Sequence, residues 1–242
     1  MPEIKTVNPA TEEVLSTYNV MSEAEAIRAV EATHEAFKDW RKLSHDERAP
    51  YLKKIAEKLR DNKEELAELM TREVGKLYQD SLDEVDLCAA IFDWTADAGP
   101  EKLKDETREL MDGKKNGVVT YQPIGVIYSV QPWNFPFYQP VRVLAANLMA
   151  GNGNVLKHAQ ICTGSALRLK EICEEAGLPK DLFNVVIIDH DTSDKLIAHD
   201  LVRGVTMTGS DKAGSHIGSL AAKHLKKSVL EQGSNDAFIV LD

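Results

Sequence analysis

The chain has 242 residues, of which 43% are hydrophobic and 28% are charged, and its formal net charge is −10. This balance is typical of a globular protein and excludes a disordered, collagen-like or low-complexity chain. The negative charge argues against a nucleic-acid partner, and no stretch reaches the roughly 20 apolar residues that cross a membrane.

The amino terminus and the cysteines bear on the cellular compartment. The first residues lack the apolar segment of a secretory signal. Cys88, Cys162 and Cys173 form no Cys-x-x-Cys pair, which suits a reducing environment. The seven histidines show no His-Glu-x-x-His spacing. We therefore expect a cytoplasmic protein without a disulfide framework and without a metal site.

Residues 1–20 are expected to form irregular structure and short strands, and two helices with clear start signals follow. Ser22 precedes Glu25 by three positions, and Ser44 precedes Glu47 in the same way. Both are capping-box patterns, in which the serine and the glutamate each accept a backbone N–H of the other. Apolar residues recur at helical spacing after each box, so we predict a helix after each serine.

Two further helices complete this region. Asn62 is expected to cap the third helix, and Gly75 is expected to end it. The fourth helix is predicted over residues 80–98, with Gly99-Pro100 as its end, because proline lacks the N–H that continues a helix.

Residues 105–123 predict a hairpin, because Asp112-Gly113 and Asn116-Gly117 are turn-forming pairs. Beyond them, short β-rich runs alternate with helical segments. The predicted strands are Gly125–Val130, Asn154–Lys157, Asn184–Ile188, Gly204–Thr208 and Phe238–Leu241, and the predicted helices are Tyr138–Ala150, Ser165–Ala176, Asp194–His199 and Ala213–His224. This alternation predicts an α/β fold: a parallel sheet with helices on both faces, preceded by an N-terminal helical layer.

Open parallel sheets bind ligands beyond the carboxyl ends of their strands, and two polar segments follow the first two predicted strands. In the first, prolines flank Trp133-Asn134, so the Asn134 amide is held on a stiff turn and could donate to a developing oxyanion. The alternative is a purely structural turn. In the second, Lys157 ends an apolar strand and could hold ribose hydroxyls or a phosphate; the alternative is a surface lysine.

Two more segments lie at later strand ends. Gly209-Ser210 opens a helix, where the backbone N–H groups and the helix dipole suit a pyrophosphate, although capping alone explains a serine there. Glu231 ends an apolar strand, where we expect it to be buried. Burial raises the pKa of a carboxyl, as a general base requires; the alternative is a structural, hydrogen-bonded glutamate.

The order of these motifs resembles the aldehyde dehydrogenase superfamily over the whole chain. The resemblance rests on Pro132-Trp133-Asn134-Phe135-Pro136, Gly151-Asn152-Gly153-Asn154 before Lys157, Ala176-Gly177-Leu178-Pro179, Thr208-Gly209-Ser210 and Leu230-Glu231. Leu156-Lys157-His158-Ala159 resembles the succinate-semialdehyde branch, where other branches have Lys-Pro. The resemblance implies a Rossmann-like, dinucleotide-binding domain over residues 1–242, with 105–123 as a hairpin of the oligomerisation element.

The resemblance also implies a role for each motif. It makes Asn134 the oxyanion donor, Glu231 the base that activates the deacylating water, and Arg142 the ligand of a substrate carboxylate. For Arg142 an intramolecular ion pair is an equal alternative. The cofactor-binding residues it implies are Trp133, Asn134, Lys157, His158, Ala159, Gln160, Gly209, Ser210 and Gln232.

The sequence departs from this family in three respects. Glu231-Gln232-Gly233-Ser234 replaces the usual Glu-Leu-Gly-Gly, so the family's backbone geometry near the nicotinamide does not carry over to these residues. Gln160 replaces an acid, so a 2′-phosphate is not repelled and NADP is acceptable as well as NAD. Family members are also about twice as long, with the nucleophilic cysteine beyond the Glu231 motif, so we expect a fragment that lacks the catalytic cysteine domain.

These implications define the expected function. It is the NAD(P)-dependent oxidation of a small aldehyde, succinate semialdehyde above all, with either a homo-oligomer or a complementing C-terminal half as the partner. A non-catalytic dinucleotide-binding or regulatory module derived from the family, and a purely structural partner of a full-length enzyme, are the alternatives. No cysteine of the chain is expected to replace the missing nucleophile.

Overall fold

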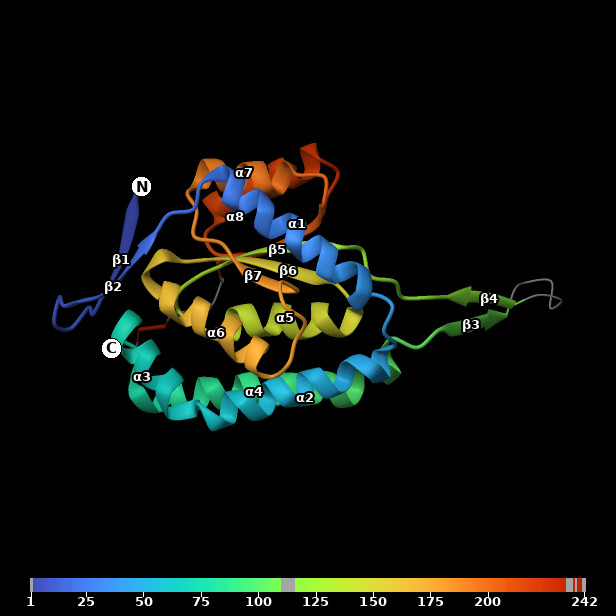
Figure 1. Cartoon of the computed structure of the whole chain (residues 1–242), viewed down its shortest axis with the longest axis horizontal. Coiled ribbons are helices and arrows are strands. Elements are labelled where there is room, and N and C mark those ends of the chain that lie inside the picture. Colours follow the sequence, from blue (N-terminus) through green and yellow to red (C-terminus); the bar gives the residue numbers. More distant parts are fainter. Residues whose placement is uncertain (1, 110–115, 234–236, 238, 241–242) are drawn as a thin grey trace.

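The computed structural model describes residues 2–109, 116–233, 237 and 239–240. The chain begins with an antiparallel hairpin of β1 (Glu3–Val7) and β2 (Val14–Asn19), as expected for the first 20 residues. It lies to one side of the molecule (Figure 1).

Both predicted capping boxes are present. The Ser22 hydroxyl accepts the Glu25 N–H at 3.3 Å, and the Glu25 carboxylate accepts the Ser22 N–H at 2.8 Å, at the start of α1 (Glu23–Trp40). Ser44 and Glu47 repeat this arrangement at the start of α2 (His45–Asp61). These local signals fix where both helices begin.

The ends of the next two helices differ in part from expectation. Gly75 ends α3 (Lys63–Val74) in a left-handed conformation with a φ of 70°, as predicted. Asn62 does not cap α3, because its side-chain amide donates to the Lys58 carbonyl of the preceding helix. The end predicted at Gly99-Pro100 is also wrong, since α4 (Tyr78–Lys102) continues past it. Gly99 serves packing instead: a Cβ there would lie 2.6 Å from Met149 Cγ.

A five-stranded parallel sheet forms the centre of the described structure, with strand order β7-β6-β5-β8-β9. This confirms the predicted α/β fold. Its strands are β5 (Val126–Gln131), β6 (Gly153–His158), β7 (Phe183–Val185), β8 (Val202–Thr208) and β9 (Lys227–Glu231), and the elements between them are α5 (Tyr138–Ala150), the short 3-10 helix η1 (Gln160–Cys162), α6 (Thr163–Glu175), α7 (His190–Ala198) and α8 (Asp211–Lys223).

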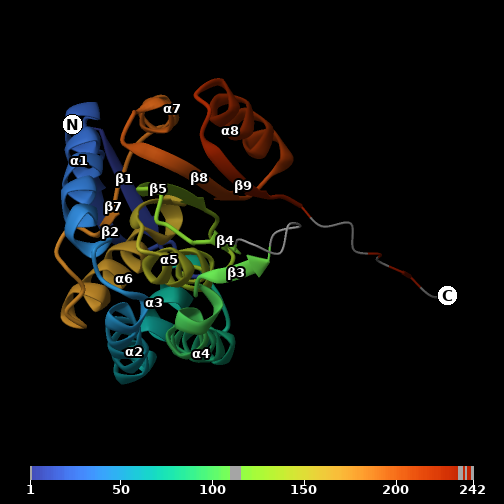
Figure 2. The same ribbon diagram turned by 90° about the vertical axis from the view of Figure 1, so that its right-hand side faces the viewer.

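Helices cover both faces of this sheet, and the N-terminal helices divide between them (Figures 1 and 2). Helix α1 lies with α7 and α8 on one face, where it shares a core with the strands. Helices α5 and α6 cover the other face, and α2, α3 and α4 form a further layer outside them. The expected N-terminal helical layer is therefore α2–α4, without α1.

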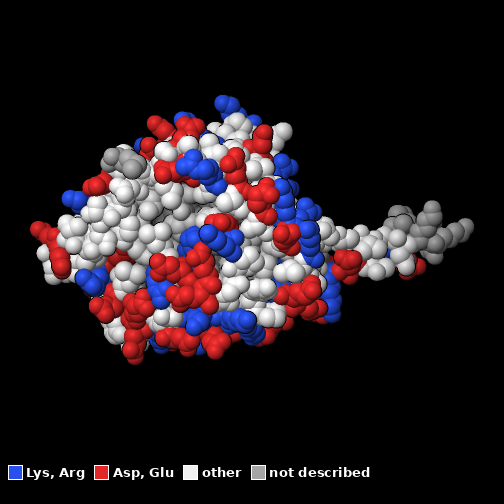
Figure 3. All heavy atoms as spheres, in the orientation of Figure 1, with Lys and Arg blue, Asp and Glu red and all other residues white. Residues whose placement is uncertain are grey.

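The outer layer is strongly charged. In Figure 3, acidic and basic side chains intermingle over it. Several form ion pairs between neighbouring helices, such as Lys53 with Asp97 at 2.7 Å and Lys63 with Asp86 at 2.5 Å. The acidic side chains of this layer therefore lie on the solvent-facing surface of the helices.

The predicted hairpin is present as β3 (Glu106–Glu109) paired with β4 (Asn116–Val119), and it projects from the body of the molecule (Figure 1). Asp112-Gly113 lies outside the described residues, and Asn116-Gly117 lies in β4 rather than in a turn. The strand predicted at Phe238–Leu241 is not seen: its two described residues, Ile239 and Val240, have no strand structure, and its ends lie outside the described residues. On this side of the described sheet the edge strand is β9 instead.

Candidate functional site

The polar segments expected at the carboxyl ends of the strands lie together at one edge of the sheet. Because β5, β6, β8 and β9 are parallel neighbours, their ends place Asn134, Lys157, Gly209 and Glu231 on the same side. Two cavities open there, and they meet at the turn between β8 and α8.

The first cavity has a volume of about 380 Å³ and lies between the turn after β5 and the ends of β8 and β9. Asn134 is exposed and Trp133 is 53% exposed, so both side chains are free to meet a ligand. The structure thus brings four of the predicted residues together here. The residues that line it are Pro132, Trp133, Asn134, Thr208, Gly209, Gln232 and Gly233.

The second cavity, of about 390 Å³, lies between the end of β6 and helices α7 and α8. It contains the predicted residues Lys157 and Ser210. Burial lowers the pKa of the Lys157 amine, and the nearby Asp189 carboxylate partly opposes this. The pocket also has lining residues that the sequence analysis did not single out, namely Val130, His190, Ser193, Asp194, Lys212, Ala213, His216 and Ile217.

The turn between β8 and α8 joins the two cavities, since Gly209 lines one and Ser210 the other. The Ser210 hydroxyl accepts the Ala213 N–H at 3.3 Å and so caps α8. The Gly209 N–H donates to the Glu231 carbonyl at 3.0 Å, so it is not the free donor that we expected. An anion at this turn would instead face the positive end of the α8 dipole.

Glu231 and Arg142 contact each other across the site. The Arg142 guanidinium donates from Nη1 to Glu231 Oε1 at 2.9 Å and from Nη2 to Thr208 Oγ1 at 3.1 Å. The Glu231 side chain is 50% exposed and the Arg142 side chain 30%. The expectation that Glu231 is buried is therefore wrong in this structure, and the intramolecular ion pair weighed for Arg142 is present.

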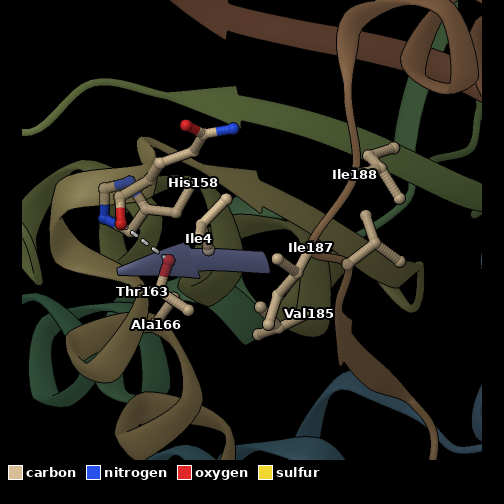
Figure 4. A pocket seen from close by; sticks show the side chains of 9 residues that line it. Ile4, His158, Thr163, Ala166, Val185, Ile187 and Ile188 are labelled. Carbon is tan, nitrogen blue, oxygen red and sulfur yellow. Dashed lines mark hydrogen bonds between the residues drawn. The ribbon is translucent and has the colours of Figure 1, made fainter. Parts of the chain in front are cut away.

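The side chain of His158, which was predicted to bind the cofactor, is buried and lines neither of the two large cavities. Together with Gln160 it borders a separate void of about 10 Å³ behind the site, beside Ile4 and Thr163 (Figure 4). A void of this size holds one water molecule at most. Ala159 is half-buried and gives its backbone N–H to the Gln131 carbonyl at 3.1 Å. Gln160 is exposed and lines neither of the two large cavities.

The cysteines are unsuited to nucleophilic chemistry. Cys88, Cys162 and Cys173 are all buried and free. Burial raises the pKa of each thiol, which keeps it protonated. The expectation that none of them is a nucleophile stays a prediction.

Sequence reasoning missed two buried glutamates behind the site. Glu73 accepts the Gly164 and Ser165 N–H groups at the start of α6, and Glu84 accepts the Phe137 N–H at the start of α5. Both helices follow directly on loops of the site. The only signal in the sequence was a carboxylate at an otherwise apolar helix position.

Within the described ranges, no group of three or more histidine, cysteine or acidic side chains could hold a metal ion. The helices of those ranges include none long and apolar enough to cross a membrane.

The comparisons with known proteins agree with one another. A model described as the aldehyde dehydrogenase family matches residues 2–242. The succinate-semialdehyde dehydrogenase [NADP(+)] of Deinococcus radiodurans is 38% identical over 98% of this chain and 49% of its own length. The succinate semialdehyde dehydrogenase [NAD(P)+] of Escherichia coli is 38% identical over 98% of this chain and 51% of its own length.

Solved structures are similar over the same extent. The succinic semialdehyde dehydrogenase from Streptococcus pyogenes in complex with NADP+ has a TM-score of 0.93 and 41% identity, covering 99% of this chain and 52% of that one. The succinate-semialdehyde dehydrogenase from Burkholderia pseudomallei has a TM-score of 0.94 and 34% identity, covering 100% and 50%. The chain thus spans about half the length of the relatives it matches, and their likeness confirms the Rossmann-like fold.

Proposed function

The chain belongs to the aldehyde dehydrogenase family, and from this premise we propose that it supplies the cofactor site, the oxyanion donor and the general base of an NAD(P)-dependent aldehyde oxidation. The proposed substrate is succinate semialdehyde, which is the substrate named for the relatives from D. radiodurans and E. coli. The observation that carries the proposal is the pair of cavities that meet at Gly209-Ser210, with Asn134 in one and Lys157 in the other.

The residues around these cavities fit a dinucleotide. Each cavity has a volume of a few hundred Å³, as small-molecule sites do. Lys157 would hold the adenosine ribose, the start of α8 would face the pyrophosphate, and Trp133, Asn134 and Gln232 would surround the nicotinamide. When bound, the nicotinamide supplies the hydride acceptor.

We expect NADP to be accepted as well as NAD because Gln160 is neutral, whereas the family resemblance implies an acid at this position that would repel a 2′-phosphate. We expect the chain to bind NADP+ no more than about tenfold more weakly than NAD+, a difference of about 1.4 kcal/mol. Calorimetric titration with both cofactors measures this. A much larger preference for NAD+ would show that the neutral Gln160 does not make NADP+ acceptable. The absence of binding by either cofactor would contradict the proposed cofactor site.

Asn134, Glu231 and Arg142 take the chemical roles in this proposal. The exposed Asn134 amide donates to the oxyanion that forms when a thiol adds to the aldehyde carbonyl. Glu231 takes a proton from the water that hydrolyses the thioester. Arg142 grips the substrate carboxylate, which requires that carboxylate to replace Glu231 as its partner.

The nucleophile must come from outside this chain, because its three cysteines are buried. We therefore propose that the 242-residue chain alone produces no reduced cofactor from succinate semialdehyde, and that a second chain carrying the nucleophilic cysteine restores turnover. Absorbance of the reduced nicotinamide measures both. Sustained turnover by the purified chain after Cys162→Ser and Cys173→Ser would contradict the proposal. In the restored enzyme, Glu231→Gln should stop the reaction at the thioester.

Assembly into an oligomer is proposed through the β3–β4 arm, which projects from the body and exposes Val118 and Val119 by 57% and 45%. The mass in solution, measured by ultracentrifugation, should fall in Val118→Lys. An unchanged mass in solution would show that the arm takes no part in assembly.

A non-catalytic dinucleotide-binding module is the second candidate. The contact between Arg142 and Glu231 favours it, because each of these residues then has the other as its partner in place of substrate or water. The two candidates differ in one result. A module binds NADP+ but gives no turnover even with a chain that supplies the nucleophile.

A further inference from the structure

The turn that carries Asn134, residues 132–137, is held in place by three side chains from other parts of the fold. Glu84 belongs to α4, Lys76 lies between α3 and α4, and His158 ends β6. They contact consecutive residues of the turn and the first residue of α5.

Glu84 fixes where the turn ends. Its side chain has no exposed area, and its Oε1 accepts the N–H groups of Phe137 at 2.8 Å and Tyr138 at 2.9 Å. These N–H groups begin α5 and have no partner within the helix. A carboxylate at this end is also favoured by the helix dipole, so Glu84 determines the position at which α5 starts.

Lys76 extends this contact to the residue beside Asn134. Its Nζ donates to Glu84 Oε2 at 2.5 Å and lies 3.6 Å from the centre of the Phe135 ring. Its side chain is only 12% exposed. One cation therefore joins the carboxylate to the aromatic ring through an ion pair and a cation–π contact.

His158 holds the middle of the turn. Its Nε2 lies 2.8 Å from the Pro136 carbonyl oxygen and donates to it when the proton is on Nε2, and its Nδ1 lies 2.9 Å from the Ala159 nitrogen and 3.2 Å from the Gln131 carbonyl oxygen. Because His158 directly follows Lys157, it ties the segment that carries the lysine to the turn that carries Asn134.

We infer that Lys76, Glu84 and His158 form a clamp that sets the position of the Asn134 amide. They are positioning residues, because they touch the backbone and ring neighbours of Asn134 and not the cavity. The functional meaning of the clamp rests on the proposed oxyanion role of Asn134, but its effect on the turn does not depend on a cofactor.

Glu73 provides a matched control within the same chain. It comes from α3, is 2% exposed, and accepts the Gly164 N–H at 2.8 Å, the Ser165 N–H at 2.9 Å and the Ser165 hydroxyl at 2.7 Å. It therefore caps α6 as Glu84 caps α5, and its described contacts do not include the turn at 132–137. A general loss of stability should affect the variants of both glutamates, whereas displacement of Asn134 should be specific to Glu84.

The experiment compares Glu84→Ala with Glu73→Ala in the 242-residue chain without cofactor. In the proton–nitrogen NMR spectrum, the side-chain amide pair of Asn134 is identified by its loss in Asn134→Asp. We expect the chemical shifts of this pair to change in Glu84→Ala and to stay the same in Glu73→Ala. Hydrogen exchange at the Phe137 amide should become about tenfold faster or more in Glu84→Ala only.

Three further variants keep the test decisive if Glu84→Ala does not fold. Glu84→Gln keeps an acceptor for the α5 N–H groups, so the Asn134 signals should move less than in Lys76→Met, which removes the cation from Phe135. His158→Phe removes the bond to Pro136 and should also move them. Unchanged Asn134 signals in folded Lys76→Met and His158→Phe would overturn the inference.

The clamp and the proposed function can fail separately. If NADP+ does not bind the unaltered chain but the Asn134 signals move as expected, the proposed function fails and the clamp stands. If NADP+ binds and the signals do not move, the clamp is wrong and the cofactor site remains.

Discussion

Replacing Glu231 with glutamine measures how strongly this carboxylate is held by Arg142. The two side chains are 50% and 30% exposed, and the contact between Nη1 and Oε1 is 2.9 Å. Exposed ion pairs contribute about 0.2–1 kcal/mol to stability, whereas breaking a buried pair costs about 3–5 kcal/mol. We therefore expect Glu231→Gln to lower the free energy of unfolding by no more than about 1 kcal/mol.

Urea unfolding followed by circular dichroism provides the assay. A double-mutant cycle with Arg142→Met separates the energy of the pair from the effects of each single substitution. The coupling should shrink in high salt, since screening acts on solvent-exposed charges. Glu35, which pairs with Lys38 on the exposed side of α1, is the control, and Glu35→Gln should show a salt dependence of the same sign.

A coupling of about 3 kcal/mol that salt does not change would refute this reasoning, because it would mean that Glu231 and Arg142 are shielded from water. The magnitude matters for function. If the pair is weak, a substrate carboxylate can replace Glu231 on Arg142 at small cost and leave Glu231 free to act as a base.

The sequence predicts those parts of the fold that depend on neighbouring residues. Ser22 and Ser44 start their helices as expected because each capping box closes over three positions. Gly75 ends α3 because the helix end needs a left-handed conformation, which glycine adopts readily. The alternation of strands and helices predicts a parallel sheet, and the sheet then brings Asn134 and Gly209 to one cavity by topology alone.

The parts that the sequence could not predict depend on distant contacts. Gly99-Pro100 reads as a helix end, but α4 continues there because Gly99 packs closely on Met149, 50 positions away. Glu84 caps α5 across 53 positions, and no local pattern links the two. Glu231 was expected to be buried because its neighbours in sequence are apolar, yet β9 is the exposed edge of the sheet.

Three further predictions follow from single residues of the described structure. Lys157→Met should raise the dissociation constant of NADP+ about tenfold, or about 1.4 kcal/mol, with little change in melting temperature. Calorimetric titration and thermal unfolding measure the two quantities, and equal binding of NADP+ would exclude Lys157 from the site. Gly75→Ala should lower the free energy of unfolding by about 1 kcal/mol, because Gly75 has a φ of +70° and its added Cβ would lie 3.0 Å from Pro9 Cγ; unchanged urea unfolding would contradict this. For His158, burial lowers the pKa of the imidazole below its ordinary value, so below about pH 6.5 the unfolded chain binds a proton that the folded chain does not. Stability should therefore fall as the pH drops from about 6.5 towards the lower folded pKa, and His158→Gln should flatten this dependence. His45, whose pKa burial also lowers, adds a contribution of the same sign, so the comparison is made in a His45→Gln background. There, a pH dependence that His158→Gln leaves unchanged would show that the pKa of His158 is the same in the folded and the unfolded chain.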